Sequence, residues 1–371
     1  MMNIGFRSHE VWSFGLQAQV LLGLRATLRT DDLVLGKGLE AFEKTLAAYV
    51  GVNYAAAVGS GSDAIYLALR ALELKAGDEV VVPANVCVAV IESILRTGAT
   101  IHFVDIDSDT YTLDVCAVKR AISARTKAVL CVHAYGLPAN MDQLNGVARE
   151  SDLRVVELCG QGFGATLNGR SVGSFGDVAC FSFNPSKILG GVGDGGAVVT
   201  NSVQIAEKVR RLANHGRAYV GANAENIGIS SRLDTFNAVV LTQRLRRVDE
   251  ELRKRRKIAR YYRALLARCK LQAEPLGYQP STQFFVIEIS QRDRIRQALE
   301  RRGILTKIHY PLPYRMPAYQ ACSRLKGMKS LVVTEKVAQR VMTLPFHNRF
   351  RRRDADYVAS CVCAALDKVG G

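Results

Sequence analysis

The chain has no apolar run long enough to cross a bilayer, so we expect no transmembrane helix. Its most apolar early stretch, residues 12–24, is interrupted by Gln17 and Gln19 and has no small-residue cleavage site typical of a signal peptide. Hydrophobic residues still make up 48% of the 371 residues, which is enough for a sizeable core. We therefore expect a soluble cytoplasmic protein without a membrane partner, built from one large and one smaller domain.

The cysteines and histidines lack the spacing of a disulfide framework or a metal site. There are nine cysteines, an odd number, and Cys131 and Cys180 lie inside apolar runs, as small core residues do in a reducing compartment. The close pair Cys361 and Cys363 has no second pair or nearby histidine to complete a zinc site. We predict neither disulfides nor a bound metal.

Acidic residues are too few to balance the basic ones, and the net charge is +16. Basic runs fall late, at residues 253–257 and 351–353. A basic face could bind nucleic acid, but no helix-turn-helix, zinc-finger or RNA-binding motif accompanies it. We favour a solvated charged face and expect no nucleic-acid partner. A further alternative is that the field attracts an anionic small substrate, such as a nucleotide-linked one.

Short β-rich runs recur along the first half of the chain, with helix-like segments between most of the early ones. The runs are residues 79–82, 101–104, 128–133, 154–157, 178–183 and 197–200. This alternation predicts an α/β fold with a largely parallel sheet covered on both faces. Residues 234–267 read as one long charged helix, and a new set of elements follows. We place the domain boundary inside that helix, which gives a large domain of residues 1–248 and a small domain of residues 249–371.

Two local patterns indicate chemistry. The small residues around Ser62 open a helix, and free N–H groups at a helix start bind phosphate, although such a start is more often only a cap. Lys187 follows the expected strand of residues 178–183, which carries Ser182, and precedes a run of glycines, residues 190–196. A lysine there suits imine formation with an aldehyde. Most lysines are merely exposed, but the strand and the glycines, which allow close backbone approach, favour a site.

From about Gly36 to its C-terminus the chain resembles the DegT/DnrJ/EryC1/StrS aminotransferases, which are fold-type-I pyridoxal-phosphate (PLP) enzymes acting on sugars. The ordered matches include Gly59-Ser60-Gly61-Ser62-Asp63-Ala64, Gly193-Asp194-Gly195-Gly196-Ala197 and His309-Tyr310-Pro311. The resemblance implies a large PLP-binding domain with a mixed, mostly parallel, seven-stranded sheet and a small C-terminal α/β domain. It also implies a homodimer with shared active sites and a sugar or small biosynthetic keto or amino substrate.

The resemblance also implies residue roles. Lys187 falls where the family's lysine forms the internal aldimine with PLP and moves the proton. Ser62, Asp63 and Ser182 fall where the phosphate is held, and Gln161 falls where the ring oxygen is contacted.

The chain departs from the family pattern in the site itself. Where the family usually has Glu-Asp-Ala-Ala-Gln, this chain has Glu157-Leu158-Cys159-Gly160-Gln161. The missing aspartate normally pairs with the protonated pyridine nitrogen and makes the ring an electron sink. Leu158 cannot do so, and we expect an unprotonated pyridine. A lost charged hydrogen bond is worth about 1.5–3 kcal/mol. Glu157 is no simple substitute, because adjacent strand residues point to opposite faces.

Three further positions differ. Cys87 stands where an aromatic residue is often stacked on the pyridine, and Ser230 stands where an asparagine reaches the phosphate from the partner subunit. Phe163 replaces a histidine. These departures leave two alternatives beside a PLP-dependent aminotransferase. One is a repurposed enzyme, with or without PLP, that uses Lys187 as base or imine-former; the other is a non-catalytic partner protein. The intact lysine and glycine loop favour retained chemistry.

Overall fold

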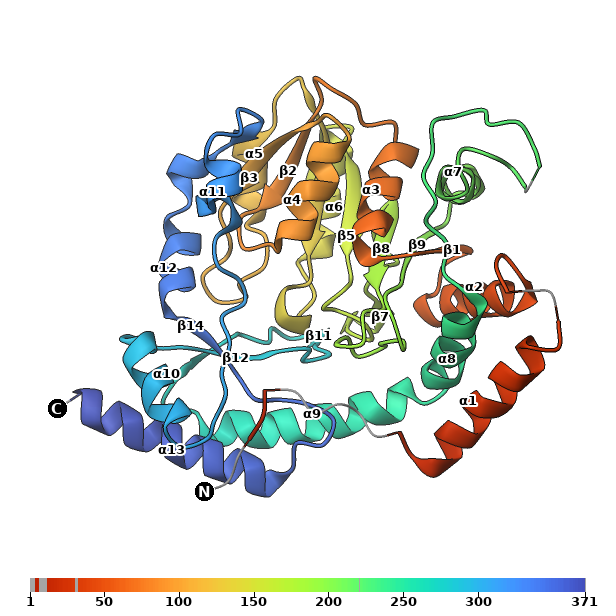
Figure 1. The fold of residues 1–371 in the computed structure, drawn as a ribbon. Coiled ribbons are helices and arrows are strands. Elements are labelled where there is room, and N and C mark those ends of the chain that lie inside the picture. The colour runs from red at the N-terminus through yellow and green to blue at the C-terminus, as the bar shows by residue number, and fades with distance from the viewer. Residues whose placement is uncertain (1–3, 7–11, 31–32, 220, 371) are drawn as a thin grey trace.

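A mostly parallel sheet forms the centre of the computed structural model, which describes residues 4–6, 12–30, 33–219 and 221–370 (Figure 1). The sheet has eight strands in the order β1-β9-β8-β5-β4-β2-β3-β13, and β9 alone among them runs in the direction opposite to the other seven. In that order the strands are β1 (Tyr54–Val58), β9 (Gly196–Thr200), β8 (Val178–Ser182), β5 (Arg154–Leu158), β4 (Thr126–Val132), β2 (Glu79–Pro83), β3 (Thr100–Val104) and β13 (Leu325–Lys326). Most are Val- and Ala-rich and buried on both faces, as interior strands of such a sheet are.

The expected number of seven strands is corrected to eight. Seven longer strands form the sheet, and the two-residue strand β13 pairs in parallel with the edge strand β3, Leu325 opposite Ile101 and Lys326 opposite His102. An edge strand presents unpaired backbone groups, and β13 covers part of that edge.

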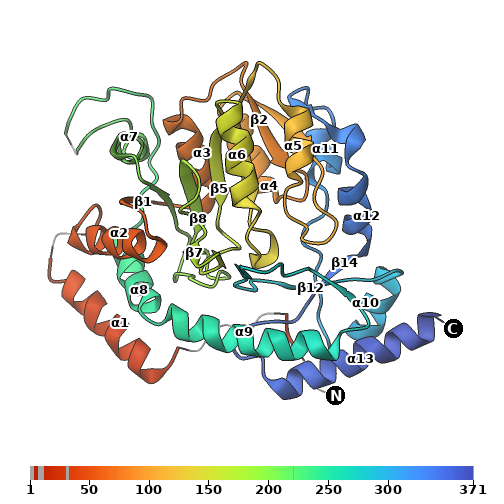
Figure 2. The same cartoon turned by 180° about the vertical axis from the view of Figure 1, so that it is seen from behind.

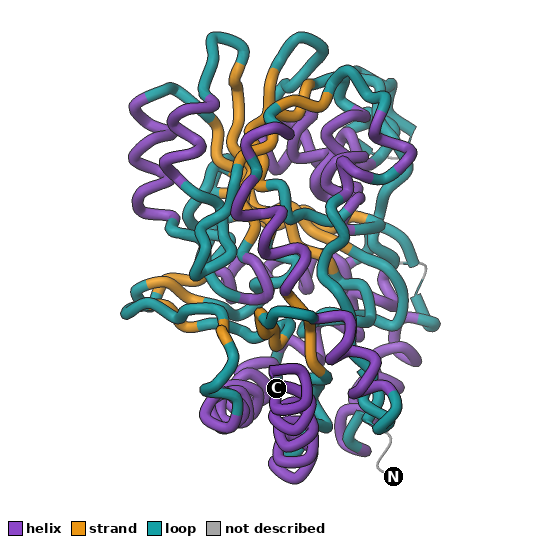
Figure 3. Tube along the Cα trace, turned by 90° about the vertical axis from the view of Figure 1, so that its left-hand side faces the viewer, coloured by secondary structure: helices purple, strands orange, loops and turns teal. Residues whose placement is uncertain are grey.

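Helices cover both faces of the sheet, as the alternation of strands and helices predicted (Figures 1, 2 and 3). One face packs against α3 (Gly61–Ala71), α4 (Val88–Arg96) and α7 (Val203–Ala213). The other packs against α5 (Val115–Ala121) and α6 (Met141–Glu150), and further along against α2 (Lys37–Val50), whose Leu39, Phe42 and Leu46 are buried. None of the described helices is long and apolar enough to cross a membrane.

The single long helix expected over residues 234–267 is two helices. α8 (Thr235–Leu245) packs against α1 (Phe14–Thr27) and α2, and α9 (Val248–Leu265) packs against the C-terminal α13 (Arg352–Gly370). The start of α9 shares the core of α8 through Val248 and Leu252, whereas Ala259 and Tyr262 further along α9 belong to the core around the small sheet.

The last third of the chain adds a three-stranded sheet of β10 (Lys270–Leu271), β12 (Phe285–Glu288) and β14 (Val341–Leu344). It is covered by α9, α13 and α10 (Arg292–Glu300). A second small sheet joins β11 (Tyr278–Gln279) to β6 (Thr166–Leu167) and β7 (Arg170–Ser171), and so ties the late segment to the early one. The remaining helices are α11 (Pro317–Gln320), α12 (Val332–Arg340) and the 3₁₀ helices Ala134–Gly136, Pro313–Arg315 and Met328–Ser330.

Candidate active site

A cavity of about 300 Å³ lies where strands β2, β5 and β8 end, the edge at which open α/β sheets bind ligands. The residues predicted from sequence that line it come from four separate stretches of the chain; they are Ser62, Cys87, Leu158, Gln161, Ser182 and Lys187. Asp63 and Ser230, which also belong to the described part of the chain, lie outside this lining. The fold therefore brings together six of the eight predicted residues within one subunit.

One end of the cavity is formed by the first turn of α3. Ser60 caps the helix, and its Oγ accepts a hydrogen bond from the N–H of Asp63 at 3.0 Å. The N–H groups of Gly61 and Ser62 precede the first intrahelical donor and have no acceptor within the helix. A Cβ on Gly61 would lie 2.6 Å from the Cβ of Ser182, so glycine is needed for β8 to approach this turn. The helix start and the Ser62 and Ser182 hydroxyls could together hold an anion, because free N–H groups at a helix start attract one.

Lys187 lies in a tight turn directly after β8. Its N–H donates to the carbonyl of Asn184 at 2.9 Å, and Asn184 Oδ1 accepts from the N–H of Ser186 at 3.1 Å. Lys187 Nζ lies 3.8 Å from the point that a Cβ on Gly160 would occupy, just beyond the end of β5. The amine is thus directed across the ends of β8 and β5 into the cavity.

Gln161 is held in a fixed orientation at the cavity wall. Its Oε1 accepts from the N–H of Tyr135 at 2.8 Å, and its Nε2 donates to the hydroxyl of Tyr310 at 3.2 Å. Nε2 can donate a second hydrogen bond and Tyr310 also lines the cavity, so both side chains can meet a polar ligand atom.

A lysine beside a helix start at the strand ends agrees with the family comparison. The model of the DegT/DnrJ/EryC1/StrS aminotransferase family matches residues 16–363. The chain belongs to this family. Its members are PLP-dependent aminotransferases.

Relatives of this aminotransferase-family chain match over almost their whole length. A UDP-N-acetyl-3-dehydro-α-D-glucosamine 3-aminotransferase of Acidithiobacillus ferrooxidans is 38% identical over 356 residues, covering 95% of each chain. The crystal structure of DesV from Streptomyces venezuelae is 37% identical, covers 98% of each chain and superposes with a TM-score of 0.93. NtdA from Bacillus subtilis, solved with bound cofactor PMP, is 29% identical, with coverage of 96% of this chain and 83% of NtdA and a TM-score of 0.87.

Leu158, at the position where the resemblance leads us to expect the partner of the pyridine nitrogen, has apolar surroundings in this aminotransferase. Leu158 ends β5, and its strand neighbours are Val132 on β4 and Cys180 on β8. All three line the cavity and are nearly fully buried. Burial raises the pKa of the Cys180 thiol, so that side chain stays neutral. This set, Val132, Leu158 and Cys180, is called the apolar floor below, and it offers no charge to a ring nitrogen.

Glu157 points away from the cavity, as expected for the residue next to Leu158. Its carboxylate accepts from the N–H groups of Gly173, Phe175 and Gly176 at 2.7–2.8 Å. It also accepts at 3.0 Å from Nε2 of His133, whose Nδ1 accepts from a backbone N–H. Glu157 therefore stabilises a loop on the opposite face of the sheet and cannot replace the missing aspartate.

His133, Glu157 and Cys159 lie close enough together that they could hold a metal ion. Both nitrogens of His133 and both oxygens of Glu157 already take part in hydrogen bonds. The cluster is explained by packing and hydrogen bonding.

The other predicted positions have varied surroundings. Cys87 precedes α4 and lines the cavity, but a thiol cannot stack on a ring as an aromatic side chain does. Asp63 Oδ2 accepts from Ser231 Oγ at 2.8 Å, and Asp63 Oδ1 pairs with Arg96 at 3.3 Å.

Ser230 is exposed, and its hydroxyl accepts a hydrogen bond from Arg232 at 3.1 Å. Phe163 is buried against Tyr49, with the rings stacked 5.3 Å apart, and so serves the core.

Sequence reasoning missed several residues that shape the site. Tyr310 belongs to the motif His309-Tyr310-Pro311, but the motif by itself did not predict that Tyr310 lines the cavity. Ser281 and Gln283 contact the segments that carry Gln161 and Lys187, and no pattern in the sequence marks them. They come from a late segment that only the folded chain brings to the strand ends.

Proposed function

We propose that this chain is a PLP-dependent aminotransferase that acts on a nucleotide-linked keto sugar and holds its cofactor through Lys187. The observation that carries the proposal is the convergence of Lys187, Ser182, Gln161 and the start of α3 on one cavity. These groups come from distant parts of the sequence and match the needs of one phosphorylated aldehyde. The N–H groups at a helix start bind a phosphate, and the amine of a lysine forms an imine with an aldehyde.

The cavity fits the cofactor at all points but one. The volume of the cavity suits the cofactor ring, and the start of α3 with Ser62 and Ser182 suits the phosphate. The amide of Gln161 suits an oxygen on the ring. When bound, the cofactor supplies a carbonyl that takes up an amino group and a ring that withdraws electrons. The apolar floor is the exception, since Leu158 can neither accept a hydrogen bond from a ring nitrogen nor stabilise its charge.

The protein's own chemistry is concentrated at Lys187. Its Nζ would be the group that holds the cofactor, and as an amine it could also carry a proton at the substrate carbon. Ser62 and Ser182 hold the phosphate, so that the ring stays aligned with Nζ. The neutral floor keeps the ring nitrogen unprotonated, and we expect proton abstraction by Lys187 to be slower than in a relative with aspartate at position 158.

The substrate assignment rests on the relatives. The Acidithiobacillus protein is named for a UDP-linked keto sugar, and it shares 38% identity with this chain across nearly the whole of both. A nucleotide-linked sugar is anionic, which agrees with the net charge of +16.

The functional unit in this proposal is a homodimer. Ser230 and the exposed Tyr219 and Ile227 belong to a loop that does not line the cavity of its own subunit. The loop can reach the phosphate site of a partner, where serine still donates a hydrogen bond. Within each subunit we place the domain division near residue 248. The start of α9 at Val248 supports it, although β11 and β13 pair with earlier strands.

Activity measurements test the proposal. Purified protein should transfer an amino group from glutamate to a UDP- or dTDP-linked keto sugar, as followed by mass spectrometry of the sugar nucleotide. Lys187→Ala should abolish the transfer, whereas Lys208→Ala, at a surface ion pair with Glu73, should leave it unchanged. Amino transfer that survives in the Lys187→Ala variant would contradict the proposal.

A further inference from the structure

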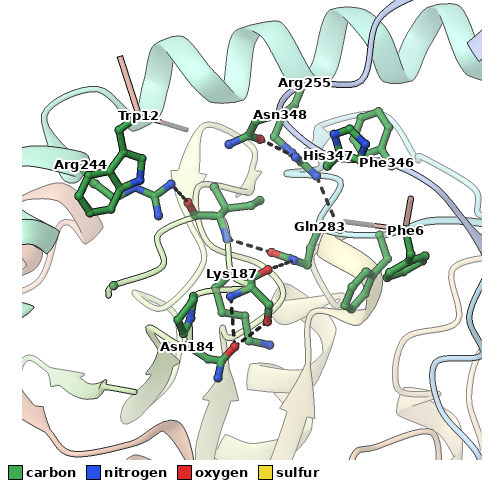
Figure 4. A pocket seen from close by; sticks show the side chains of 15 residues that line it. Phe6, Trp12, Asn184, Lys187, Arg244, Arg255, Gln283, Phe346, His347 and Asn348 are labelled. Carbon is green, nitrogen blue, oxygen red and sulfur yellow. Dashed lines mark hydrogen bonds between the residues drawn. The ribbon is translucent and has the colours of Figure 1, made fainter. Parts of the chain in front are cut away.

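Gln283 holds the peptide groups on both sides of Lys187. Its Oε1 accepts from the N–H of Ile188 at 3.1 Å, and its Nε2 donates to the carbonyl of Ser186 at 3.0 Å (Figure 4). The side chain is only 7% exposed. A primary amide carries an acceptor and a donor at a fixed spacing, so this one group can fix both flanking peptides at once.

Gln283 is itself fixed by α9. Arg255 Nη2 donates to the carbonyl of Thr282 at 2.8 Å, and its Nη1 donates to Asn348 at 2.6 Å. Thr282 has a φ of 51°, in the left-handed region that a β-branched residue rarely adopts. The backbone before Gln283 is therefore held in one conformation by its surroundings, and the amide is presented at a defined place.

The same short segment also contacts the Gln161 side of the cavity. Ser281 Oγ donates to the carbonyl of Gln161 at 3.2 Å, and the N–H of Ser281 donates to the carbonyl of Gly136 at 2.9 Å. A Cβ on Gly136 would lie 2.7 Å from the nitrogen of Gln283, so only glycine allows this approach. Residues 281–283 thus contact both segments that carry the proposed chemistry.

We infer that Gln283 is a positioning residue for Lys187 and that residues 281–283 couple the β12 sheet to the active-site loop. The inference rests on the proposed function, which gives Lys187 its chemical role. A lysine side chain is long and flexible, and the place of its Nζ depends on the orientation of its Cα. A loop that shifts by about 1 Å can lower a rate by about a hundredfold.

The test compares Gln283→Met with Gln272→Met. Methionine keeps the approximate volume and removes the hydrogen bonds. Gln272 is a matched control because it is also buried and donates to two carbonyls, of Thr110 and Ala134, but does not contact the Lys187 loop. In Gln283→Met, amide hydrogen exchange in residues 184–191 should speed up by about tenfold or more. Gln272→Met should leave exchange in that loop unchanged.

The kinetic comparison separates positioning from folding. Gln283→Met should lower kcat by about tenfold to a hundredfold with KM within about threefold of wild type. Gln283→Glu keeps an acceptor for the N–H of Ile188, but as a carboxylate it has no donor for the carbonyl of Ser186. Its kcat should therefore lie between the values of wild type and Gln283→Met. Unchanged loop exchange in Gln283→Met, or equal exchange and kcat losses in both methionine variants, would overturn the inference. Wild-type protein without amino transfer would contradict the proposed function instead, since the exchange measurement needs no cofactor.

Discussion

Leu158 is the residue that most distinguishes this site from its family. The resemblance to the family indicates that Leu158 replaces an aspartate that pairs with the pyridine nitrogen of the cofactor. The structure adds that Val132 and Cys180 lie beside Leu158 and extend the same neutral surface. Glu157 does not replace it, because its carboxylate accepts hydrogen bonds on the other face of the sheet. Among the described residues, the one acid that lines the cavity is Asp194, whose carboxylate accepts a hydrogen bond from Asn184 at 2.8 Å. Val132, Leu158 and Cys180 together therefore form a continuous neutral surface at the ends of β4, β5 and β8.

Restoring the acid should restore the electron sink. We expect Leu158→Asp to raise kcat for amino transfer by about tenfold to a hundredfold, which corresponds to the ~1.5–3 kcal/mol of a charged hydrogen bond. Leu158→Asn, of similar size but uncharged, should give little gain. Nitrogen-15 NMR of labelled cofactor should detect a neutral ring nitrogen in wild type and a protonated one in Leu158→Asp. A protonated nitrogen in the wild-type protein would contradict this view of the apolar floor.

At the level of elements, the edge strand β13 is joined to the sheet by charge as well as backbone pairing. Glu79, at the start of β2, is buried and accepts from Lys326 of β13 at 2.6 Å and from Ser123 at 2.8 Å. Burial alone would raise the pKa of Glu79, but the hydrogen bonds from Lys326 and Ser123, together with nearby Arg125, hold it below its ordinary value. Because the pKa is lower in the folded state, the ionised Glu79 stabilises the fold above its unfolded pKa, and this stability is lost as pH falls.

Glu79→Gln should therefore lower the free energy of unfolding at pH 7 by about 1–3 kcal/mol. The difference from wild type should shrink as the pH falls below about 4.5, through the depressed pKa of the folded state. Urea unfolding at neutral and acidic pH measures both effects. Glu73→Gln is the control, because its ion pair with Lys208 is exposed and should contribute nothing measurable. A loss that stays constant down to pH 3 would argue against the ion-pair explanation.

The elements also show how far sequence could predict the structure. The runs at residues 79–82 and 154–157 were recognisable because buried parallel strands are nearly continuous in Val and similar residues. The pair Leu325–Lys326 was not, since two residues form a strand only by pairing with a distant edge. In the site, Ser182 and Lys187 could be predicted from a strand followed by glycines. Gln283 could not, since its role depends on tertiary contacts alone.

At the level of the whole molecule, the charge is divided very unevenly. Residues 249–371 contain 26 of the 50 Lys and Arg residues and 11 of the 34 Asp and Glu residues, and so carry +15 of the net +16. Several of these bases are exposed on α9 and α13, including Arg253, Lys257 and Arg260. Arginines 351–353 stand at the start of α13, where the helix dipole disfavours positive charge. The Arg352 guanidinium lies over the Tyr261 ring at 4.9 Å, and Arg353 pairs with Asp354 at 3.7 Å. The unfavourable position relative to the helix dipole agrees with a role in attracting anions.

This charge should steer an anionic substrate. We expect kcat/KM for a nucleotide-linked sugar to fall about threefold or more when ionic strength rises from ~50 to ~300 mM, with kcat nearly constant. Replacing Arg351, Arg352 and Arg353 together with glutamine should weaken that dependence. A kcat/KM that does not respond to salt would show that the basic surface has no part in substrate capture.

The central claim is that Lys187 carries the cofactor in a cavity with an apolar floor, and one measurement tests it most directly. Purified protein is incubated with PLP, reduced with borohydride, digested and mapped by mass spectrometry. The account predicts one cofactor adduct per chain, on Lys187, with loss of the yellow colour on reduction. Protein that stays colourless with added PLP, or an adduct on other lysines while Lys187 is unmodified, would contradict it.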